Sequence, residues 1–484
     1  MKTAERLEAG HPRDAQYWWK LPAMFRGNHR LHFTGIGGIG MSGIAELLIN
    51  LGCSVSGSDI KPGPVIDRLR ALGGEINIGH KAEHVYGADV VVISSALRPD
   101  NPELVEARRL QIPVIARAEM LAELMRLKYG IAVAGAHGKT TITSMIATVM
   151  VGGGLDPTAV IGGRLNAFGS NAKLGLGEFL VAEADESDGS FLMLSPTIAV
   201  ISNIDREHMD HYADMNEIRG AFVDFANKIP FYGAVVACAD DANVCSILPR
   251  LKRRFVTYGF ADHADVSASR FEFQGFGSSC VVCRKKNVLG TLRLRVPGRH
   301  GALNALAAVA TALELGIPFD KTAAALADFQ NADRRFQIRG ESGGVLAADD
   351  YGHHPTEITA TLSAVRQSCG RRIIAVFQPH RYSRVQALSE EFARAFDDAD
   401  LLITLPIYAA GEDAIPGIDS ESLVERIKQY GHRDAVYVSD FDAALRLLRG
   451  VTKEGDLVLT LGAGDVWKIG EMFLRETPSK EYAQ

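Results

Sequence analysis

The sequence predicts an α/β protein built from three consecutive units. Short apolar runs alternate with segments of helical spacing along the 484 residues, which is typical of parallel sheets with helical crossovers. Two glycine-rich turns, Gly35–Gly40 and Gly135–Thr141, each follow an apolar run and precede a helical segment. The length also favours about three domains. We place the three units at residues 1–127, 128–336 and 337–484.

The composition is that of an ordinary globular protein. Hydrophobic residues make up 47% of the chain, charged residues 23%, and the net charge is −6. Because there is no long basic run, we expect no nucleic-acid partner. The few scattered cysteines fit a reducing compartment. The charged N-terminus lacks the apolar core of a signal peptide, and no stretch has membrane-spanning length. We therefore expect a cytoplasmic protein, and we leave a homo-oligomer open.

The first unit carries a dinucleotide-binding fingerprint. Gly35, Gly37 and Gly40 follow a strand in the pattern GxGxxG, and Asp59 ends the next strand. These glycines would let a diphosphate approach the helix N-terminus, with Asp59 near a ribose. The fingerprint does not distinguish NAD from a nucleotide-sugar diphosphate, and a glycine turn without a ligand is the other interpretation. The elements expected here are strands at Leu31–Thr34, Val55–Ser58 and Asp89–Ser94 and a helix at Met41–Leu51.

The second unit opens with a phosphate loop. The apolar strand Tyr129–Ala134 leads into Gly135–Thr141, and helical spacing follows. Backbone N–H groups and the positive helix end in such a turn bind phosphate oxygens. Lys139 would reach the terminal phosphates, and the Thr140 hydroxyl would hold Mg²⁺. The loop is shorter than a standard Walker A motif, because Val133 occupies the position of its first glycine. We expect a nucleoside triphosphate site here.

Acidic residues follow the next strand of this unit. The strand Phe179–Glu183 runs into the carboxylate-rich segment Glu183–Asp188. Several carboxylates are costly to bury unpaired, and a divalent cation beside the phosphates would offset that cost. Glu183 is the favoured metal contact because it ends its strand. The other interpretation is a solvated acidic loop. His208 follows the strand Thr197–Ser202 and is either a metal ligand or a structural histidine.

In the remainder of the second unit, the sequence pattern predicts a strand, a β insert and a helix. Ala234–Ala237 continues the pattern of buried strands, and Ala264–Val296 changes to short alternating runs typical of an antiparallel insert. Cys280 and Cys283 form a lone CxxC, which we interpret as part of an amphipathic strand rather than as a zinc site. An Ala-rich helix is expected over His300–Leu315.

The third unit places basic and aromatic residues after its strands. Arg381 and Arg384 lie beside His380 in the segment after the second strand, and paired arginines suit a carboxylate or phosphate. A surface basic loop is the other interpretation. A second polar segment, Asp349–Pro355, follows the first strand. The expected strands are Gly344–Asp349, Arg372–Phe377, Asp400–Leu405 and Leu457–Leu461, and the last closes with the tight turn Gly462–Asp465 into a helix.

Seven phrases together resemble the Mur ligase family, the ATP-dependent amide-forming enzymes of peptidoglycan precursor synthesis. They are GIGGIGMSGIAELL, AGAHGKTTITSMIA, EADESDGSFL, HMDHY, DDYGHHPTEI, FQPHRYSR and GAGDVWKIG. The resemblance covers the chain from about Arg30 onward. It is closest to the branch that joins L-alanine to UDP-N-acetylmuramate, since DDYGHHPTE and QPHRYSR are similar to that branch. The branch that recycles murein tripeptide shares only the first part.

The resemblance implies a Rossmann-like UDP-sugar domain, a central P-loop ATPase domain and a C-terminal Rossmann-like amino-acid domain. It also implies that ATP phosphorylates the muramate carboxylate and that the amine of L-alanine attacks the acyl phosphate. Implied catalytic residues are Lys139, His208 and Arg381, and implied Mg²⁺ ligands are Thr140, Glu183 and His208. Implied ATP contacts are Gly135, Ala136, His137, Gly138, Lys139, Thr140, Thr141, Asn304 and Arg335. Implied UDP-sugar contacts are Gly35, Gly37, Gly38, Gly40, Asp59, Asn166, Asn171 and Ser187. Implied alanine contacts are Tyr351, His380, Arg381 and Arg384, with weaker carry-over to Asp350 and His353.

The chain departs from the family pattern at a few positions. Ala136 replaces a common Thr, His300-Gly301 replaces the usual His-Asn before the adenine contact, and Glu207 stands where Asp is common. The segment Ile218–Ala226 contains no lysine, so we expect no carbamylated metal ligand. Two functions of other classes remain as alternatives. One is an NAD(P)-dependent dehydrogenase, which rests on GxGxxG alone, and the other is a nucleotide-switch protein without catalysis.

Overall fold

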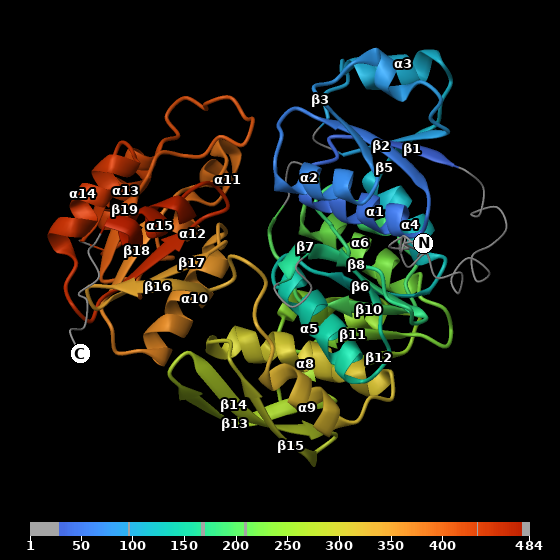
Figure 1. Cartoon of the computed structure of the whole chain (residues 1–484). Coiled ribbons are helices and arrows are strands. Elements are labelled where there is room, and N and C mark those ends of the chain that lie inside the picture. Colours follow the sequence, from blue (N-terminus) through green and yellow to red (C-terminus); the bar gives the residue numbers. More distant parts are fainter. Residues whose placement is uncertain (1–28, 95–96, 166–169, 208–210, 433, 477–484) are drawn as a thin grey trace, which may run out of the picture.

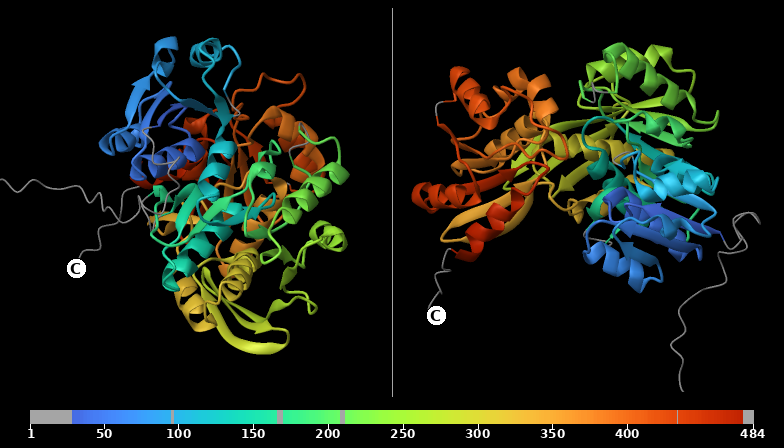
Figure 2. Two further views of the ribbon diagram at one scale, coloured as in Figure 1. Left: turned by 90° about the vertical axis from the view of Figure 1, so that its right-hand side faces the viewer. Right: turned by 90° about the horizontal axis from the view of Figure 1, so that it is seen from above.

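The computed structural model describes residues 29–94, 97–165, 170–207, 211–432 and 434–476. The described chain forms three α/β units, each around its own sheet (Figure 1). In Figure 1 the first unit lies above the second and the third unit lies to their left, and both the first and the third contact the second (Figures 1 and 2). Two of the predicted site residues, Asn166 and His208, lie outside the described residues.

The first unit is a five-stranded parallel sheet in the order β3-β2-β1-β4-β5. Its strands are β1 (Arg30–Thr34), β2 (Ser54–Asp59), β3 (Glu75–Ile78), β4 (Val90–Ile93) and β5 (Val114–Ala116). Its helices are α1 (Ile39–Asn50), α2 (Pro64–Ala71), α3 (Pro102–Arg109) and α4 (Arg117–Met125). The three strands expected from the sequence are present. The short strands β3 and β5 were not predicted, because three or four residues carry too little periodicity.

The second unit is a ten-stranded sheet in the order β15-β14-β13-β12-β11-β10-β6-β9-β7-β8. Its first strands are β6 (Tyr129–Ala134), β7 (Thr158–Leu165), β8 (Ser170–Lys173), β9 (Phe179–Glu183) and β10 (Ile198–Ile201). The others are β11 (Ala234–Cys238), β12 (Phe255–Gly259), β13 (Val266–Gln274), β14 (Gly277–Arg284) and β15 (Asn287–Leu294). Its helices are α5 (Lys139–Gly152), α6 (Met215–Asn227), α7 (Ala242–Ile247), α8 (Gly298–Glu314) and α9 (Phe319–Ala327).

The expected β insert is antiparallel, but it is not a separate sheet. Strands β13, β14 and β15 pair antiparallel, and β13 joins the central sheet through a short parallel pairing with β12. Within β14, Cys280 is buried and Cys283 is only partly buried. Residues three apart on a strand point to opposite faces, so the two thiols cannot share one ligand. This geometry supports the interpretation of the CxxC as part of an amphipathic strand.

The third unit is a six-stranded sheet in the order β16-β17-β21-β18-β19-β20, with β16 antiparallel. Its strands are β16 (Gln337–Ser342), β17 (Val345–Asp350), β18 (Ile373–Phe377), β19 (Leu401–Thr404), β20 (Ala435–Tyr437) and β21 (Leu457–Leu461). Its helices are α10 (Pro355–Ser368), α11 (Tyr382–Ala387), α12 (Ser389–Phe392), α13 (Ser420–Gln429), α14 (Phe441–Val451) and α15 (Trp467–Glu476). The strand expected to end at Asp349 extends to Asp350. The backbone of Asp350 is therefore held in the sheet.

The first two units pack closely along α1. Met41 to Leu48 are all buried, because α1 lies between its own sheet and strands β7 and β8 of the second unit. A Cβ at Gly43 would lie 3.3 Å from the Ala172 side chain, which shows how near α1 comes to β8. The Asn171 amide of β8 donates to the Ile39 carbonyl and, at 3.2 Å, to the Ser42 hydroxyl.

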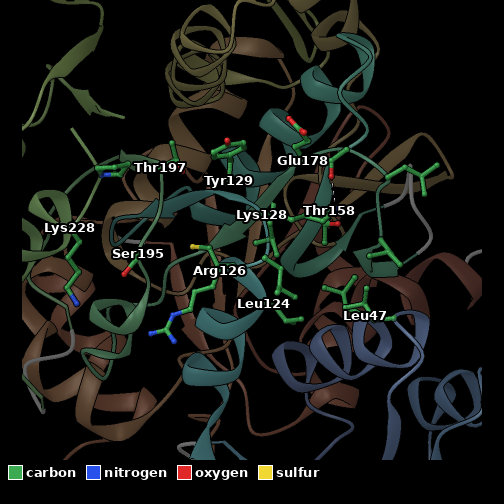
Figure 3. Close-up of a pocket in the computed structure, with 18 of the residues that line it drawn as sticks. Leu47, Leu124, Arg126, Lys128, Tyr129, Thr158, Glu178, Ser195, Thr197 and Lys228 are labelled. Carbon is green, nitrogen blue, oxygen red and sulfur yellow. Dashed lines mark hydrogen bonds between the residues drawn. The ribbon is translucent and has the colours of Figure 1, made fainter. Parts of the chain in front are cut away.

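A cavity of about 660 Å³ lies beside this junction (Figure 3). Its lining includes Leu47 of α1, the run from Leu124 to Tyr129 that leads from α4 into β6, and Lys228, which lies across the cavity from Leu47. No residue of the phosphate loop lines the cavity, so it is separate from the predicted phosphate site.

A buried carboxylate holds the first sheet to α3. Glu103 is fully buried and accepts hydrogen bonds from the Ser58 hydroxyl at 2.6 Å, from His84 Nδ1 at 2.7 Å and from His32 Nε2 at 3.2 Å. Burial raises the pKa of Glu103, but the hydrogen bonds from His32, Ser58 and His84 outweigh it and lower the pKa to about 2.

We expect Glu103→Gln to lower the free energy of unfolding at pH 7 by about 2 kcal/mol. Because the folded pKa lies below the unfolded one, this contribution is present above about pH 4.5 and is lost as the pH falls toward about 2. The stability of the variant should therefore fall less steeply over that range. Urea unfolding at several pH values checks this, with the exposed Glu83→Gln as a control. Parallel pH profiles for wild type and Glu103→Gln would contradict it.

Candidate active site

The phosphate loop is shaped by two glycines and fixed by side chains after β10. Gly135 and Gly138 have φ angles of 135° and 83°, a region that residues with a Cβ rarely adopt. The backbone N–H of His137 donates to Asn203 Oδ1 at 2.8 Å, and its carbonyl accepts from Ser202 Oγ at 2.8 Å. Helix α5 begins at Lys139, so its unpaired N–H groups face the loop. This is the local geometry of an anion site.

Lys139 lies folded back over the loop. Its Nζ donates to the Gly135 carbonyl at 2.7 Å and to Glu186 Oε1 at 2.8 Å. Burial lowers the pKa of Lys139, but the charges of Glu186 and Asp185 outweigh it and raise the pKa above its ordinary value. Lys139 is therefore a cation at neutral pH, within the loop that would enclose a phosphate.

The structure brings two of the three predicted Mg²⁺ ligands together. Strands β6 and β9 are parallel neighbours with Val133 opposite Glu183, so the phosphate loop and the acidic segment leave the same sheet edge. Burial raises the pKa of Glu183 above its ordinary value, although a hydrogen bond from the Gly162 N–H at 2.6 Å, the Lys139 charge and the Thr140 hydroxyl oppose the rise. Glu183 and Thr140 thus lie next to each other. A carboxylate and a hydroxyl oxygen suit Mg²⁺, which takes its remaining ligands from phosphate and water.

The predicted adenine contact lies against the loop. A Cβ at Gly138 would lie 2.8 Å from Asn304 Oδ1, so Asn304 of α8 packs directly on the loop. A cavity of about 670 Å³ adjoins it, lined by Phe260, Arg299 and His300 among others. The Arg299 guanidinium lies 4.1 Å above the Phe260 ring. Phe260 and Arg299 were missed from the sequence, because neither belongs to a motif.

The glycine loop of the first unit borders a cavity of about 500 Å³. Gly35, Gly37, Gly38, Asp59, His80 and Ser94 are among its lining residues. Asp59, expected beside a ribose, lines this cavity, and one of its carboxylate oxygens accepts from the Gly37 N–H at 2.8 Å.

An arginine that the sequence did not single out connects this loop to the acidic segment. A Cβ at Gly40 would lie 2.8 Å from an Arg117 guanidinium nitrogen, so Arg117 lies against the loop. Its Nη2 is 3.3 Å from Asp185 Oδ2. Asp185 Oδ1 accepts from the Ser187 N–H at 3.2 Å, which places Ser187 at the same junction. Because Arg117 follows β5, only the packing of the first two units brings it here.

The predicted alanine contacts form one cluster in the third unit. The Tyr351 and His353 rings are 5.3 Å apart, the His353 and His380 rings 5.6 Å, and Arg384 Nη1 is 3.3 Å from His380 Nδ1. Burial and then the charges of His353, Arg384 and Arg381 lower the pKa of His380 to about 3. Burial lowers the pKa of His353 to about 4. The cluster therefore combines arginine cations with neutral imidazoles.

The third unit contacts the second beside the phosphate loop. Arg384 Nη2 lies 3.3 Å from Glu207 Oε1. Arg335 lies where the two units join, and its Nη1 is 3.6 Å from Glu357 Oε1. The Arg335 guanidinium also lies 5.2 Å above the Tyr351 ring. Arg335, predicted as an ATP contact, thus reaches both the alanine cluster and the electrostatic surroundings of Glu183.

Among the described residues, one group of histidine and carboxylate atoms is close enough to hold a metal ion: His137, Asp205 and His354. Burial lowers the pKa of His137, but its hydrogen bond to the Asp205 carboxylate and the nearby charge of Glu357 outweigh burial and raise the pKa to about 10. His354 Nδ1 accepts the Thr356 N–H at the start of α10. His137 Nε2 is hydrogen-bonded to Asp205 and His354 Nδ1 to the Thr356 N–H, so we interpret the group as a hydrogen-bonded contact between two units.

Comparison with known proteins identifies the family. The chain matches the Mur ligase family catalytic domain over residues 30–129, the Mur ligase middle domain over 133–312 and the Mur ligase glutamate ligase domain over 334–464. The chain belongs to the Mur ligase family. Members named UDP-N-acetylmuramate–L-alanine ligase include one from Geotalea uraniireducens, 56% identical over 92% of this chain and 98% of its own. One from Syntrophotalea carbinolica is 58% identical over 91% and 96%.

Solved structures of the Mur ligase family share the fold. The UDP-N-acetylmuramate-alanine ligase of Thermotoga maritima superposes with a TM-score of 0.78 at 29% identity, over 92% of this chain and 98% of its own. The murein peptide ligase of Psychrobacter arcticus has a TM-score of 0.68 at 24% identity over the same shares, which shows the fold alone. The family and the α/β fold predicted from the sequence are confirmed. No helix among the described residues is long and apolar enough to cross a membrane.

Proposed function

We propose that this chain joins L-alanine to UDP-N-acetylmuramate at the expense of ATP, in peptidoglycan precursor synthesis. The observation that carries the proposal is the interface at which Arg384 of the Tyr351, His353 and His380 cluster pairs with Glu207, next to the contact between phosphate-loop His137 and Glu357. The UDP-sugar would bind to the first unit (residues 1–127), ATP to the second (128–336) and the amino acid to the third (337–484). Because ATP and UDP-sugars are cytoplasmic metabolites, we infer that the reaction takes place in the cytoplasm.

The first chemical step is phosphoryl transfer. A carboxylate oxygen of the muramate attacks the terminal phosphorus of ATP, the bond to the bridging oxygen breaks, and ADP leaves with that electron pair. Lys139 stabilises charge on the transferred group, and the N–H groups at the start of α5 bind the phosphate chain. Thr140 and Glu183 would hold Mg²⁺, with His208 as the third predicted ligand. The bound metal would neutralise phosphate charge.

The second step is amide formation. The amine nitrogen of L-alanine attacks the carbonyl carbon of the acyl phosphate, and the tetrahedral intermediate collapses with loss of phosphate. Arg381 and Arg384 would bind the alanine carboxylate through forked hydrogen bonds. The ammonium group of L-alanine must enter the site and lose a proton before its nitrogen can attack. Because His353 and His380 are neutral, they do not repel this cation. The amine and the acyl phosphate come from different units, so catalysis requires the third unit to approach the second.

Phosphate release with single omissions tests the proposal. The purified chain should release phosphate from ATP only when both UDP-N-acetylmuramate and L-alanine are present, and omission of either should abolish release. Preference for the murein tripeptide over L-alanine would favour the recycling branch of the family. Nicotinamide binding would favour the dehydrogenase alternative, and ATP binding without phosphate release would favour a nucleotide switch.

A further inference from the structure

The side chain of His137 points out of the phosphate loop toward the third unit. Its backbone N–H and carbonyl are held by Asn203 and Ser202. That ring lies 4.7 Å from the ring of His354, just before α10. Only 13% of the His137 side chain is exposed. A residue of the nucleotide-binding loop is therefore buried against the unit that carries the amine cluster.

Two carboxylates from different units flank this imidazole. His137 Nε2 lies 2.8 Å from Asp205 Oδ2, which belongs to the second unit. His137 Nδ1 lies 3.6 Å from Glu357 Oε1, in the first turn of α10. Asp205 Oδ2 also accepts the Thr356 hydroxyl at 3.0 Å, so α10 contacts the same carboxylate directly. The ring thus completes a continuous polar bridge from the phosphate loop to α10.

Glu357 connects this bridge to the alanine cluster. Its Oε2 accepts the backbone N–H of His353 at 3.1 Å, and His353 contacts both Tyr351 and His380. Glu357 also completes the capping box of α10 with His354. A shift of His137 relative to Glu357 would therefore be transmitted to the segment that carries Tyr351 and His353.

We propose that His137 is a positioning residue that locks the start of α10 onto the phosphate loop and so aligns the amine site with the phosphoryl group. The alignment of the amine with the phosphoryl group rests on the proposed function. The contact between the third unit and the phosphate loop does not depend on that function. The coupling is reciprocal: a ligand that stabilises the phosphate loop favours docking of the third unit, and docking of the third unit stabilises the loop by the same free energy. A nucleotide on the loop and an amine on the third unit are then coupled through one ring.

A variant outside the catalytic and binding residues tests the lock. Thr356→Val removes the hydroxyl that binds Asp205 and leaves His137 intact. Thr359→Val is its matched control, because Thr359 is exposed one turn along α10. We expect Thr356→Val to increase the radius of gyration in small-angle X-ray scattering and to raise the KM for L-alanine about tenfold. Thr359→Val should match wild type. Scattering curves of Thr356→Val that superpose on those of Thr359→Val would overturn the proposal.

A double-mutant cycle isolates the bridge itself. His137→Ala and Glu357→Gln should each enlarge the molecule in the same scattering experiment, and the double variant should be no larger than either, because the two residues share one interaction. Glutamine keeps the capping box of α10, so Glu357→Gln preserves the helix start. Additive expansion would contradict the lock. Since scattering requires no turnover, a wild-type chain that releases no phosphate would refute the proposed ligation and leave this test valid.

Discussion

Replacing Lys139 with alanine is expected to lower the rate of substrate-dependent phosphate release by about a thousandfold. The loss should be large because Lys139 is the cation of the phosphate loop and stays protonated beside Glu186 and Asp185. Phosphoryl transfer depends mainly on positioning and on stabilising charge, so the missing cation should lower the maximal rate more than it weakens ATP binding. Phosphate release at saturating ATP, with both substrates present, measures the effect.

The Lys139 experiment needs a control for folding. Glu186 is only 4% exposed, and removing its partner leaves a buried charge that costs about 3–5 kcal/mol. The double variant Lys139→Ala/Glu186→Gln removes both charges and avoids that cost. It should melt close to wild type yet remain as inactive as the single variant. A folded double variant within tenfold of the wild-type rate would show that Lys139 does not act on the phosphoryl group.

Glu183→Gln is expected to reduce the rate at a fixed low Mg²⁺ concentration by about a hundredfold, with partial recovery at high Mg²⁺. Glutamine keeps the size of the side chain and an oxygen for the Gly162 N–H, but it lacks the charge that would bind the ion. Activity titrated against Mg²⁺ measures the shift in the concentration required.

Asp188→Asn is the matched control for Glu183→Gln. Asp188 belongs to the same acidic segment and loses the same charge, but it is exposed and accepts only a local hydrogen bond from the Ser190 N–H among the contacts described. Its Mg²⁺ titration should follow wild type. If both variants shift equally, the general negative charge of the segment holds the metal and Glu183 has no special place.

The phosphate loop shows what local sequence predicts well. A strand, a glycine turn and a helix start are specified within about fifteen residues, because glycine conformation and helix dipoles act at short range. The same holds for the acidic strand end at Glu183, which lies beside the loop because parallel strands end at one sheet edge. Asp59 shows the limit: the sequence places it at the end of β2, but its hydrogen bond from the Gly37 N–H was not predicted.

Contacts between units could not be read from the sequence. Arg384 and Glu207 are 177 residues apart, and Arg117 and Asp185 are 68 apart, so no periodicity links either pair. The bridge from His137 to Glu357 is of the same kind. Each pair depends on how two finished units pack.

By itself, the sequence determined the three α/β units, the two glycine turns and the chemical character of each strand end, because these follow from short-range backbone preferences and hydrophobic periodicity. Only the tertiary structure decided which strand ends face one another, that Arg117 joins the site, and that the phosphate-loop histidine reaches the third unit. The reason is physical: burial and charge pairing between distant segments are set by packing, which the local pattern does not encode.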